Sequence, residues 1–542
     1  MFFQDFPYIL SWWSIIFLIG TIFFPFTNRL FTNFKDRGYI FAKIIGIAVL
    51  SYLAWLLGFL HLLPFGQPSL YLILFGLVFL NLIWWQKNPA AAKIDLSARL
   101  KNNWTFIKII IFEEVIFSAT FVFWAFVKGH QSDIQGLEKF MDFGFINSIL
   151  HSIYFPPPDM WLVKAASATS DNFINYYYFG HLVTAVLTKL SNLDPAVTFN
   201  LMLSTIFAFT FTGSFSIAIN LIASSLSLRG RVLWSSDEAI LTRHSGLSRI
   251  RFWSPRLLAG PQNDDRNQIA SLPRSVHTNV VARNDNIITI IFSLLTAFLV
   301  TLAGNLHTIY AFTKGYLPAD KPIPFWQLLG KGIDFSAYWY PNATRFIPFA
   351  IHEFPSYSFV VSDLHGHVLD IPFVLLTIAL LLSLVLSTSK IKSTKTFDFL
   401  PELLPFDLLL LTLLGFLLAI MYMTNAWDGL IYFGLSALVF LYIYYQHYWP
   451  NLNSLILKFF NSLILLVVLF VLFSLPLLLC GGIYLSFTAS SFWGPRACRG
   501  GLQNRFWARF ASLACQNDKL TFLFRCLRLT YDHSFYRPSY LS

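Results

Sequence analysis

The chain has 542 residues, of which 56% are hydrophobic, 18% are aromatic and only 12% are charged. This composition excludes an ordinary soluble domain. It indicates an integral membrane protein, because apolar runs of about 20 residues, the length that crosses a bilayer, recur along the chain. The net charge of +11 does not predict a nucleic-acid partner, and we expect none, since the excess of basic residues is concentrated in two segments, 227–285 and 492–542.

These two segments also differ from the rest in composition. Together they hold sixteen of the twenty Arg but one of the eighteen Lys. We interpret 227–285 as an Arg-rich cytoplasmic insertion without regular structure, because it lacks helical or strand periodicity. The tail 491–542 is rich in Arg and Cys, and we hypothesise that both segments have an origin different from the remainder, the tail being non-native.

The predicted fold class is all-α, a polytopic transmembrane helical bundle of about 10–11 spans with outer-face loops and interfacial helices. The N-terminal bundle covers 1–226 and includes a large outer loop at 128–196; the C-terminal bundle covers 286–490. The first apolar run is predicted to be a retained span, since "MFFQDFPYIL" lacks a positive n-region. The predicted spans are 7–25, 39–62, 69–85, 105–127, 197–226, 286–308, 366–387, 404–424, 428–447 and 454–484.

Short loops rich in Lys and Arg predict the orientation of the spans, because such loops stay in the cytoplasm. These loops are 26–40, 86–104 and 388–396. An even number of crossings must separate the last two, so we expect 173–190 to be an interfacial or re-entrant helix that stays outside. The alternative is that 197–226 is a hairpin of two half-spans. The first topology brings 128–196, 309–365 and 425–428 to the outer face.

Two carboxylates begin the outer loop. If 137–151 is a helix, Glu138 and Asp142 are four residues apart and share a face. A carboxylate that is partly desolvated beside a second one has a raised pKa and can act as a general base on a hydroxyl group. The alternative reading is that both acids are solvated or cap the helix.

Three consecutive tyrosines follow in "NYYYFGH". On a helix, Tyr177 and Tyr178 would lie on the same face as His181, with Tyr176 beside them. Such a face can stack on a sugar while its hydroxyl groups make hydrogen bonds. The alternative is an aromatic belt at the edge of the bilayer, where Tyr is common.

The stretch "SDLHGHVLD" enters a predicted span. Read as a helix, it puts Asp363, Gly366, His367 and Asp370 on one polar stripe, and ionisable groups at this depth usually face a bundle interior or a wet cavity. Read as extended chain, Asp363, His365 and His367 resemble a divalent-cation site, for Mg or Mn. The histidines can also bind a phosphate without a metal.

Two further sets of polar residues belong to the same outer face. Glu353 precedes the histidines in their loop. In "TNAWDG", Asn425 and Asp428 are three residues apart at the start of a span, with Trp427 between them, and Asn425 can cap the helix. The chain contains no Walker loop and no dinucleotide fingerprint, which removes ATP-driven pumps and soluble-type oxidoreductases from consideration.

The stretches "EKFMDFGFINSIL", "YFPPPDMW", "NYYYFGH", "EFPSYSFVVSDLHGHVLDIPF" and "TNAWDG" resemble the signature of the Chlor_Arch_YYY membrane proteins, a family named after its triple tyrosine. The resemblance covers about 1–490 apart from the Arg-rich insertion. The family is in turn similar to the multi-span glycosyltransferases of the C superfamily, which take a sugar from a polyprenyl-phosphate carrier.

That resemblance implies an enzyme of the cell membrane. Its partners would be membrane lipids and a polyprenyl-phosphate-linked sugar, and its general base would be Asp142 in "KFMDF", or Glu138. The tyrosines, His181, Glu353, the histidine stretch and Asn425 to Asp428 would bind the substrate. The rival hypothesis is a secondary transporter or flippase that uses the same Asp and His groups as a proton relay. A third is an assembly subunit without activity.

Overall fold

The described part of the computed structural model comprises residues 2–87, 104–161, 173–241, 274–304, 353–388 and 404–480. These residues form thirteen helices and no strand. Seven of the helices are long and apolar enough to cross a membrane. Three shorter apolar stretches are also helical, Gln67–Asn81, Ile287–Leu302 and Leu408–Thr424. Each predicted span lies on a helix, and eight of the ten agree with the helix bounds within about five residues, whereas the helices at 197–226 and 286–308 extend further, over Pro195–Leu241 and Arg274–Leu302. The fold is therefore the all-α polytopic bundle that the hydropathy pattern predicted.

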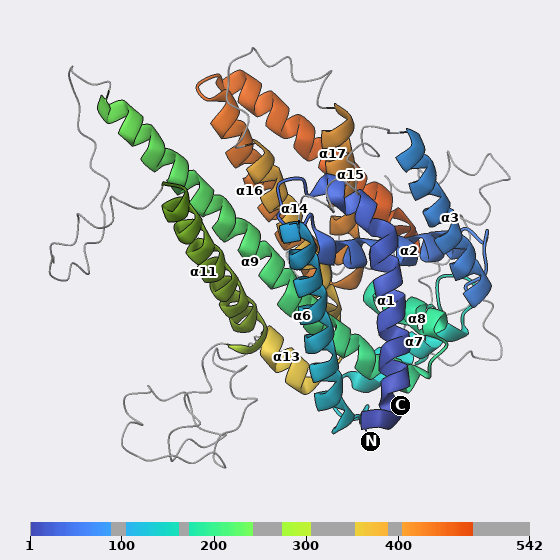
Figure 1. Ribbon diagram of the computed structural model, residues 1–542. Coiled ribbons are helices and arrows are strands. Elements are labelled where there is room, and N and C mark those ends of the chain that lie inside the picture. Colours follow the sequence, from blue (N-terminus) through green and yellow to red (C-terminus); the bar gives the residue numbers. More distant parts are fainter. Residues whose placement is uncertain are drawn as a thin grey trace, which may run out of the picture.

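In chain order the helices are α1 (Phe2–Leu30), α2 (Tyr39–Phe59), α3 (Gln67–Lys87), α6 (Trp104–Gly129), α7 (Lys139–His151), α8 (Phe179–Ser191), α9 (Pro195–Leu241), α11 (Arg274–Leu302), α13 (Pro355–Val361), α14 (Gly366–Thr388), α15 (Leu404–Thr424), α16 (Ala426–Tyr448) and α17 (Leu452–Cys480). Figure 1 shows the helices as one bundle, with α9 and α11 side by side along one edge.

Burial divides the spans into two groups. In α2, α9 and α14, two thirds or more of the residues in the apolar 18-residue stretch are buried inside the protein. In α16 and α17 the buried share of that stretch is 17% and 11%. Leu438, Leu457 and Ile464 are exposed by 60% or more. A helix that exposes this much apolar surface is stable where lipid covers it, so α16 and α17 form a lipid-facing side of the bundle.

The stretch 173–190, for which the sequence predicts a helix that does not cross the membrane, contains most of α8. With 13 residues, α8 is about 20 Å long, too short to cross the hydrocarbon core. Eleven of its residues are buried, and it packs against α2, α7, α14 and α15. The prediction of a helix that does not cross is consistent with this length. Because α8 packs among other helices, it does not lie exposed on the surface of the bundle, and its interfacial or re-entrant position stays a prediction.

Helix α9 is continuous from Pro195 to Leu241. The alternative of a hairpin at 197–226 is therefore wrong. A single glycine such as Gly213 costs a helix only about 1 kcal/mol, which the surrounding packing offsets. The helix extends beyond the apolar run, and α11 begins at Arg274, so both ends of the Arg-rich segment 227–285 are helical. Residues 242–273, and the tail 491–542, lie outside the described residues.

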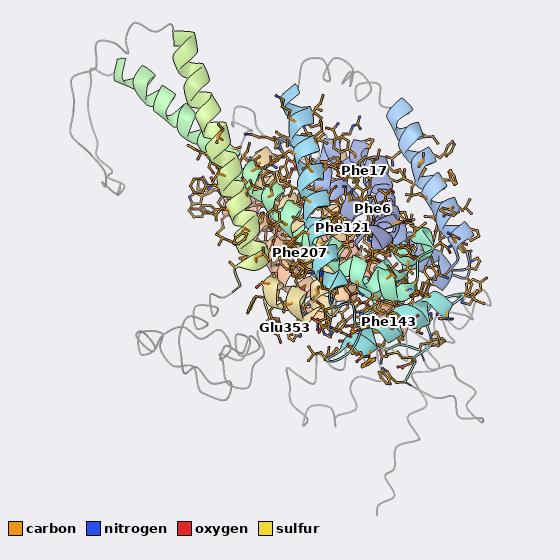
Figure 2. All side chains as sticks on the ribbon, turned by 60° about the horizontal axis from the view of Figure 1, so that its bottom comes forward. Phe6, Phe17, Phe121, Phe143, Phe207 and Glu353 are labelled. Atoms are coloured by element: carbon orange, nitrogen blue, oxygen red, sulfur yellow. The ribbon has the colours of Figure 1, made fainter. Side chains whose placement is uncertain are left out.

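One end of the bundle collects the segments that carry the sequence motifs. Helices α7, α8 and α13 lie there, together with the first residues of α1 (Figure 1). Figure 2 turns this end towards the viewer and labels Phe143 of α7 and Glu353, which precedes α13. The loop between α1 and α2 lies at the opposite end, where Asn33 donates to Ser387 near the end of α14 over 2.6 Å.

Candidate functional site

A buried acid and a buried histidine form the centre of the site. Asp142 lies in the first turn of α7 and His181 in the first turn of α8. Nε2 of His181 is 2.9 Å from Oδ1 of Asp142, and neither side chain is exposed. Among the described residues no hydrogen bond reaches Oδ2 of Asp142 or Nδ1 of His181. Buried polar atoms are rarely left without a hydrogen-bond partner, and both of these atoms are closed to solvent.

The second carboxylate of the motif lies on the same face of α7. The backbone N–H of Asp142 donates to the carbonyl of Glu138 over 3.0 Å, as the predicted helix requires. Oε2 of Glu138 is 2.7 Å and Oδ1 of Asp142 is 4.0 Å from Nδ1 of His365. The Glu138 contact is within the range of an ion pair but is not aligned for a hydrogen bond. The four-residue spacing therefore directs both acids to one imidazole.

His365 precedes α14 and is partly exposed, with 21% of its side chain accessible, whereas Glu138 is 57% accessible. Burial lowers the pKa of His365, and this outweighs the carboxylates of Asp142 and Glu138, which act in the opposite direction. His365 is consequently a neutral imidazole at neutral pH, able to donate one hydrogen bond and accept another.

His367 has a different set of partners. Its Nε2 is 2.5 Å from Oε2 of Glu353 and 3.1 Å from the hydroxyl oxygen of Ser358. The ring centroids of His365 and His367 are 5.4 Å apart. The hydrogen bond and charge of His367 hold the pKa of Glu353 below its ordinary value, although burial acts against them. Two imidazoles thus lie side by side, each beside its own glutamate.

The carboxyl group of Asp363 has a strongly raised pKa. The residue is 9% exposed. Burial, followed by the charge of Asp142, raises its pKa to about 6. A carboxyl group with such a pKa exchanges protons near neutrality, which is the property that general acids and bases need.

The helix predicted for 362–370 begins later than expected. Ser362 has a φ of 63° and α14 starts at Gly366, so Asp363 and His365 precede the helix. The predicted stripe of four residues is therefore wrong, and only Gly366, His367 and Asp370 lie on α14. The non-helical turn before Gly366 allows the rings of His365 and His367 to lie side by side. On a continuous helix, two residues at this spacing would point to opposite sides.

Glycines permit the close packing around this turn. A Cβ atom on Gly366 would lie 2.5 Å from the carbonyl oxygen of Thr424 and 2.7 Å from the ring of Tyr177. A Cβ atom on Gly180 would lie 2.6 Å from Leu369 and 2.9 Å from Thr424. Helices α8, α14 and the end of α15 therefore approach one another at distances that only glycine allows.

The motif at the start of α16 joins the site through one of its residues. Nδ2 of Asn425 donates to Oδ2 of Asp428 over 2.7 Å. Asn425 occupies the N-cap position but makes no side-chain cap, so the predicted capping bond is wrong. Asp428 lies close enough to His367 and to the fully buried Asp370 for its charge to act on both. Trp427 is 61% exposed and lies outside the site, because it is about 100° around the helix from Asp428.

The three tyrosines do not form the predicted helix face. Helix α8 begins only at Phe179, because the preceding segment is extended: Phe173 pairs with Pro158, and the N–H of Ile174 donates to Pro157 over 3.0 Å. Tyr178 is 2% exposed and accepts a hydrogen bond from Nε1 of Trp55 over 3.0 Å. It supports the fold and, together with Trp55, lines a small pocket.

Tyr176 and Tyr177 are the accessible members of the triplet. The Tyr176 hydroxyl donates to that of Tyr177 over 2.5 Å, and the ring of Tyr177 packs edge-on against His365 at 6.4 Å. Tyr176 also lines the same small pocket, whose residues are mostly apolar or aromatic. The pocket residues include Trp55, Phe59, Pro156, Phe173, Asn175 and Leu477.

The residues do not fit the metal site of the extended reading. Within the described ranges no three His, Cys, Asp or Glu side chains converge as metal ligands. Asp363, His365 and His367 do not come together as a set, since the two histidines face separate glutamates. No role for Mg or Mn follows from this geometry.

Sequence reasoning overlooked two contributors. Ser358 lies one helix turn into α13 and reaches His367; its position inside the "EFPSYSF" motif was the available signal. Trp55 of α2 fixes Tyr178, and nothing in the local sequence distinguishes it from other span tryptophans, because its partner is 123 residues away.

The bundle and its polar end define a multi-pass integral membrane protein. The model of the family described as uncharacterized membrane protein, DUF2298, matches residues 49–492, and the chain belongs to this family, which is the YYY-type family expected from the motifs. No curated protein and no solved structure gives a significant match to the chain.

Proposed function

We propose that the protein is an inverting glycosyltransferase that takes a sugar from a polyprenyl-phosphate lipid at the non-cytoplasmic face of the membrane. The observation that supports this most is the meeting of Glu138, Asp142, His181 and His365 at one end of the bundle. Acids with histidine partners, reachable from the membrane edge, suit a reaction in which a hydroxyl group loses a proton while a phosphate leaves. The basic loops assign this end to the outer side.

The proposed step is a single displacement. The oxygen of the acceptor hydroxyl forms a bond to the anomeric carbon, the bond from that carbon to the phosphate oxygen breaks, and the hydroxyl proton passes to a carboxylate. Glu138 is the carboxylate we assign to this role, because it is 57% accessible whereas Asp142 is fully enclosed. A base must come within about 3 Å of the proton that it takes.

Asp142 is then a positioning residue. It holds His181 at 2.9 Å and lies 4.0 Å from His365, so its negative charge orients the imidazole that faces Glu138. It also raises the pKa of Asp363. Removing the charge of Asp142 would therefore alter the pH dependence of the reaction as well as its rate.

The leaving phosphate and its lipid tail have suitable surroundings. His365 and His367 offer two ring N–H groups that can donate to phosphate oxygens. The pocket beside Tyr176 includes the α17 residue Leu477, and α17 exposes most of its apolar surface. An apolar tail that lies in the lipid beside α17 would leave its head group free to contact the histidines.

The test is a transfer assay on purified protein in liposomes, with a panel of polyprenyl-phosphate sugars and mass-spectrometric detection of the product. We expect Glu138→Gln to lower kcat at least 100-fold, the size of a general-base contribution. The matched control is Asp133→Asn, an exposed acid on the same outer loop, which should keep wild-type activity. Transfer that is unchanged in Glu138→Gln removes this base. Movement of the lipid across sealed vesicles without transfer would instead establish the flippase alternative.

A further inference from the structure

A second cluster of buried ionisable groups lies at the opposite end of the bundle. Asp36 in the loop between α1 and α2 and Glu113 of α6 are both 0% exposed. The backbone N–H of Lys35 donates to Asn220 of α9 over 2.6 Å, which fixes the loop against α9. None of these residues contacts the proposed transfer site.

The two acids have unequal surroundings. Asp36 accepts hydrogen bonds at both oxygens, from the Ser216 hydroxyl over 2.5 Å and from Nδ2 of Asn220 over 2.8 Å. Neither oxygen of Glu113 accepts a hydrogen bond from any described residue. Its carboxyl group lies next to that of Asp36. An ionised Glu113 would be a buried charge without a donor, next to a second negative charge, and this is the most costly arrangement available to it.

The neighbouring cation does not remedy this. Lys43 of α2 forms its ion pair with Glu114 and not with Glu113, and Glu114 also accepts from Tyr39 over 2.8 Å and from Trp13 over 3.1 Å. Glu114 is therefore the satisfied carboxylate of the α6 pair. The charged or titratable groups facing Glu113 are Asp36 from the loop, Tyr39 and Lys43 from α2, and Glu114 from its own helix. Helix α9 contributes the neutral Ser216 and Asn220.

We infer that Asp36 and Glu113 form a proton-binding site in the cytoplasmic half of the bundle, in which Glu113 carries the proton and donates it to Asp36. The bound proton converts two repelling carboxylates into one hydrogen-bonded pair. It thereby ties α6 to the loop and, through Ser216 and Asn220, to α9. Burial raises the pKa of Asp36, while its hydrogen bonds from Ser216 and Asn220 act against this, and Glu113 has no such donors. This inequality assigns the proton to Glu113.

The site predicts how stability depends on pH. The folded protein holds a proton that the unfolded chain, with ordinary acids, has released at neutral pH. Stability from this pair is therefore present at low pH and is lost as the pH rises through the value at which the folded protein releases its proton. Glu113→Gln should fold, because the amide N–H of glutamine can donate to Asp36 in place of the carboxyl group.

Infrared spectroscopy of the full-length protein in lipid nanodiscs tests the inference, because the carbonyl stretch of a protonated carboxyl group is separate from the carboxylate bands. We expect a component of the protonated-carboxyl band that is lost in Glu113→Gln and retained in Asp133→Asn, a control that replaces an exposed acid and leaves the Lys43–Glu114 pair in place. In parallel, the decline of Tm with rising pH should be weaker in Glu113→Gln than in the wild type. An unchanged band in Glu113→Gln overturns the proposal.

A second variant keeps the test decisive if Glu113→Gln does not fold. Ser216→Ala removes one of the two donors to Asp36 and leaves both acids in place. A less stabilised Asp36 carboxylate binds the shared proton more tightly, so the protonated-carboxyl band should persist to higher pH than in the wild type. Release of the proton at the wild-type pH in Ser216→Ala would show that Asp36 is not the acceptor, and would overturn the pairing.

Discussion

Nε2 of His181 lies 2.9 Å from Oδ1 of Asp142, and both side chains are completely enclosed although 39 residues separate them in the chain. The pair joins the first turns of α7 and α8. A buried hydrogen bond between a carboxylate and an imidazole is costly to break from one side only, because the remaining group loses its partner without gaining water.

Asp142→Asn should therefore destabilise the protein by about 3–5 kcal/mol, the usual cost of removing one partner from a buried pair. Thermal unfolding in detergent measures this. His181→Gln alone should cost a similar amount, and the double variant should cost less than the sum of the two, by about 1–3 kcal/mol, because the interaction is lost only once. Additive effects would contradict a direct interaction.

Gly366→Ala should destabilise the protein by about 1–3 kcal/mol, as overpacking of a tight contact does. The added methyl group would meet the backbone carbonyl of Thr424 at 2.5 Å and the Tyr177 ring at 2.7 Å, and only the ring can move away. The control is Gly434→Ala in α16, where nothing lies within 4 Å of the added atom. It should be neutral or stabilise the helix by up to about 1 kcal/mol. Equal effects of the two substitutions would argue against the close approach of α14 and α15.

Asp363→Asn should stabilise the protein at neutral pH. The pKa of Asp363 is raised to about 6 by burial and by the charge of Asp142. The folded protein thus binds a proton more tightly than the unfolded chain. Stability from this group is present below the ordinary aspartate pKa and is lost as the pH rises to about 6, at a cost of up to about 3 kcal/mol above that value.

The measurement for Asp363 is Tm as a function of pH for wild type and Asp363→Asn. The two curves should converge in acid, separate as the pH rises from the ordinary aspartate pKa to about 6, and stay apart above that value, with the variant higher. A variant that is less stable than the wild type throughout would show that the carboxylate makes a favourable contact that outweighs its burial.

Glu353 should show the opposite dependence. His367 holds its pKa below the ordinary value, so stability from the pair is present above the pKa of an unfolded glutamate and is lost as the pH falls through the lower folded value. Glu353→Gln should lower Tm at neutral pH and should narrow its gap to the wild type as the medium becomes acidic. The matched control is Asp159→Asn, because the Asp159 carboxylate accepts only from the backbone N–H of Trp161 in the described structure. The difference in Tm between this variant and the wild type should not shrink as the pH falls.

Hydropathy alone was sufficient for the class of protein and for most of its helices. Each apolar run coincides with a helix because lipid offers no hydrogen-bond partners, so the backbone must satisfy itself within the run. Helix α7 was also foreseeable, together with the common direction of Glu138 and Asp142, since four residues make about one turn. The triple tyrosine and its companion motifs indicated the family that the chain belongs to.

Only the tertiary structure decided the roles of individual side chains. It buried Asp142 while leaving Glu138 open, started α8 after the tyrosines, and started α14 only at Gly366, which leaves Asp363 out of the polar stripe. It also brought Asp36 next to Glu113, 77 positions away in the sequence. Local pattern records the hydrogen bonds and apolar faces of one helix at a time. The protonation and accessibility of a buried acid depend on atoms from other helices, whose approach is determined by packing at residues such as Gly180 and Gly366.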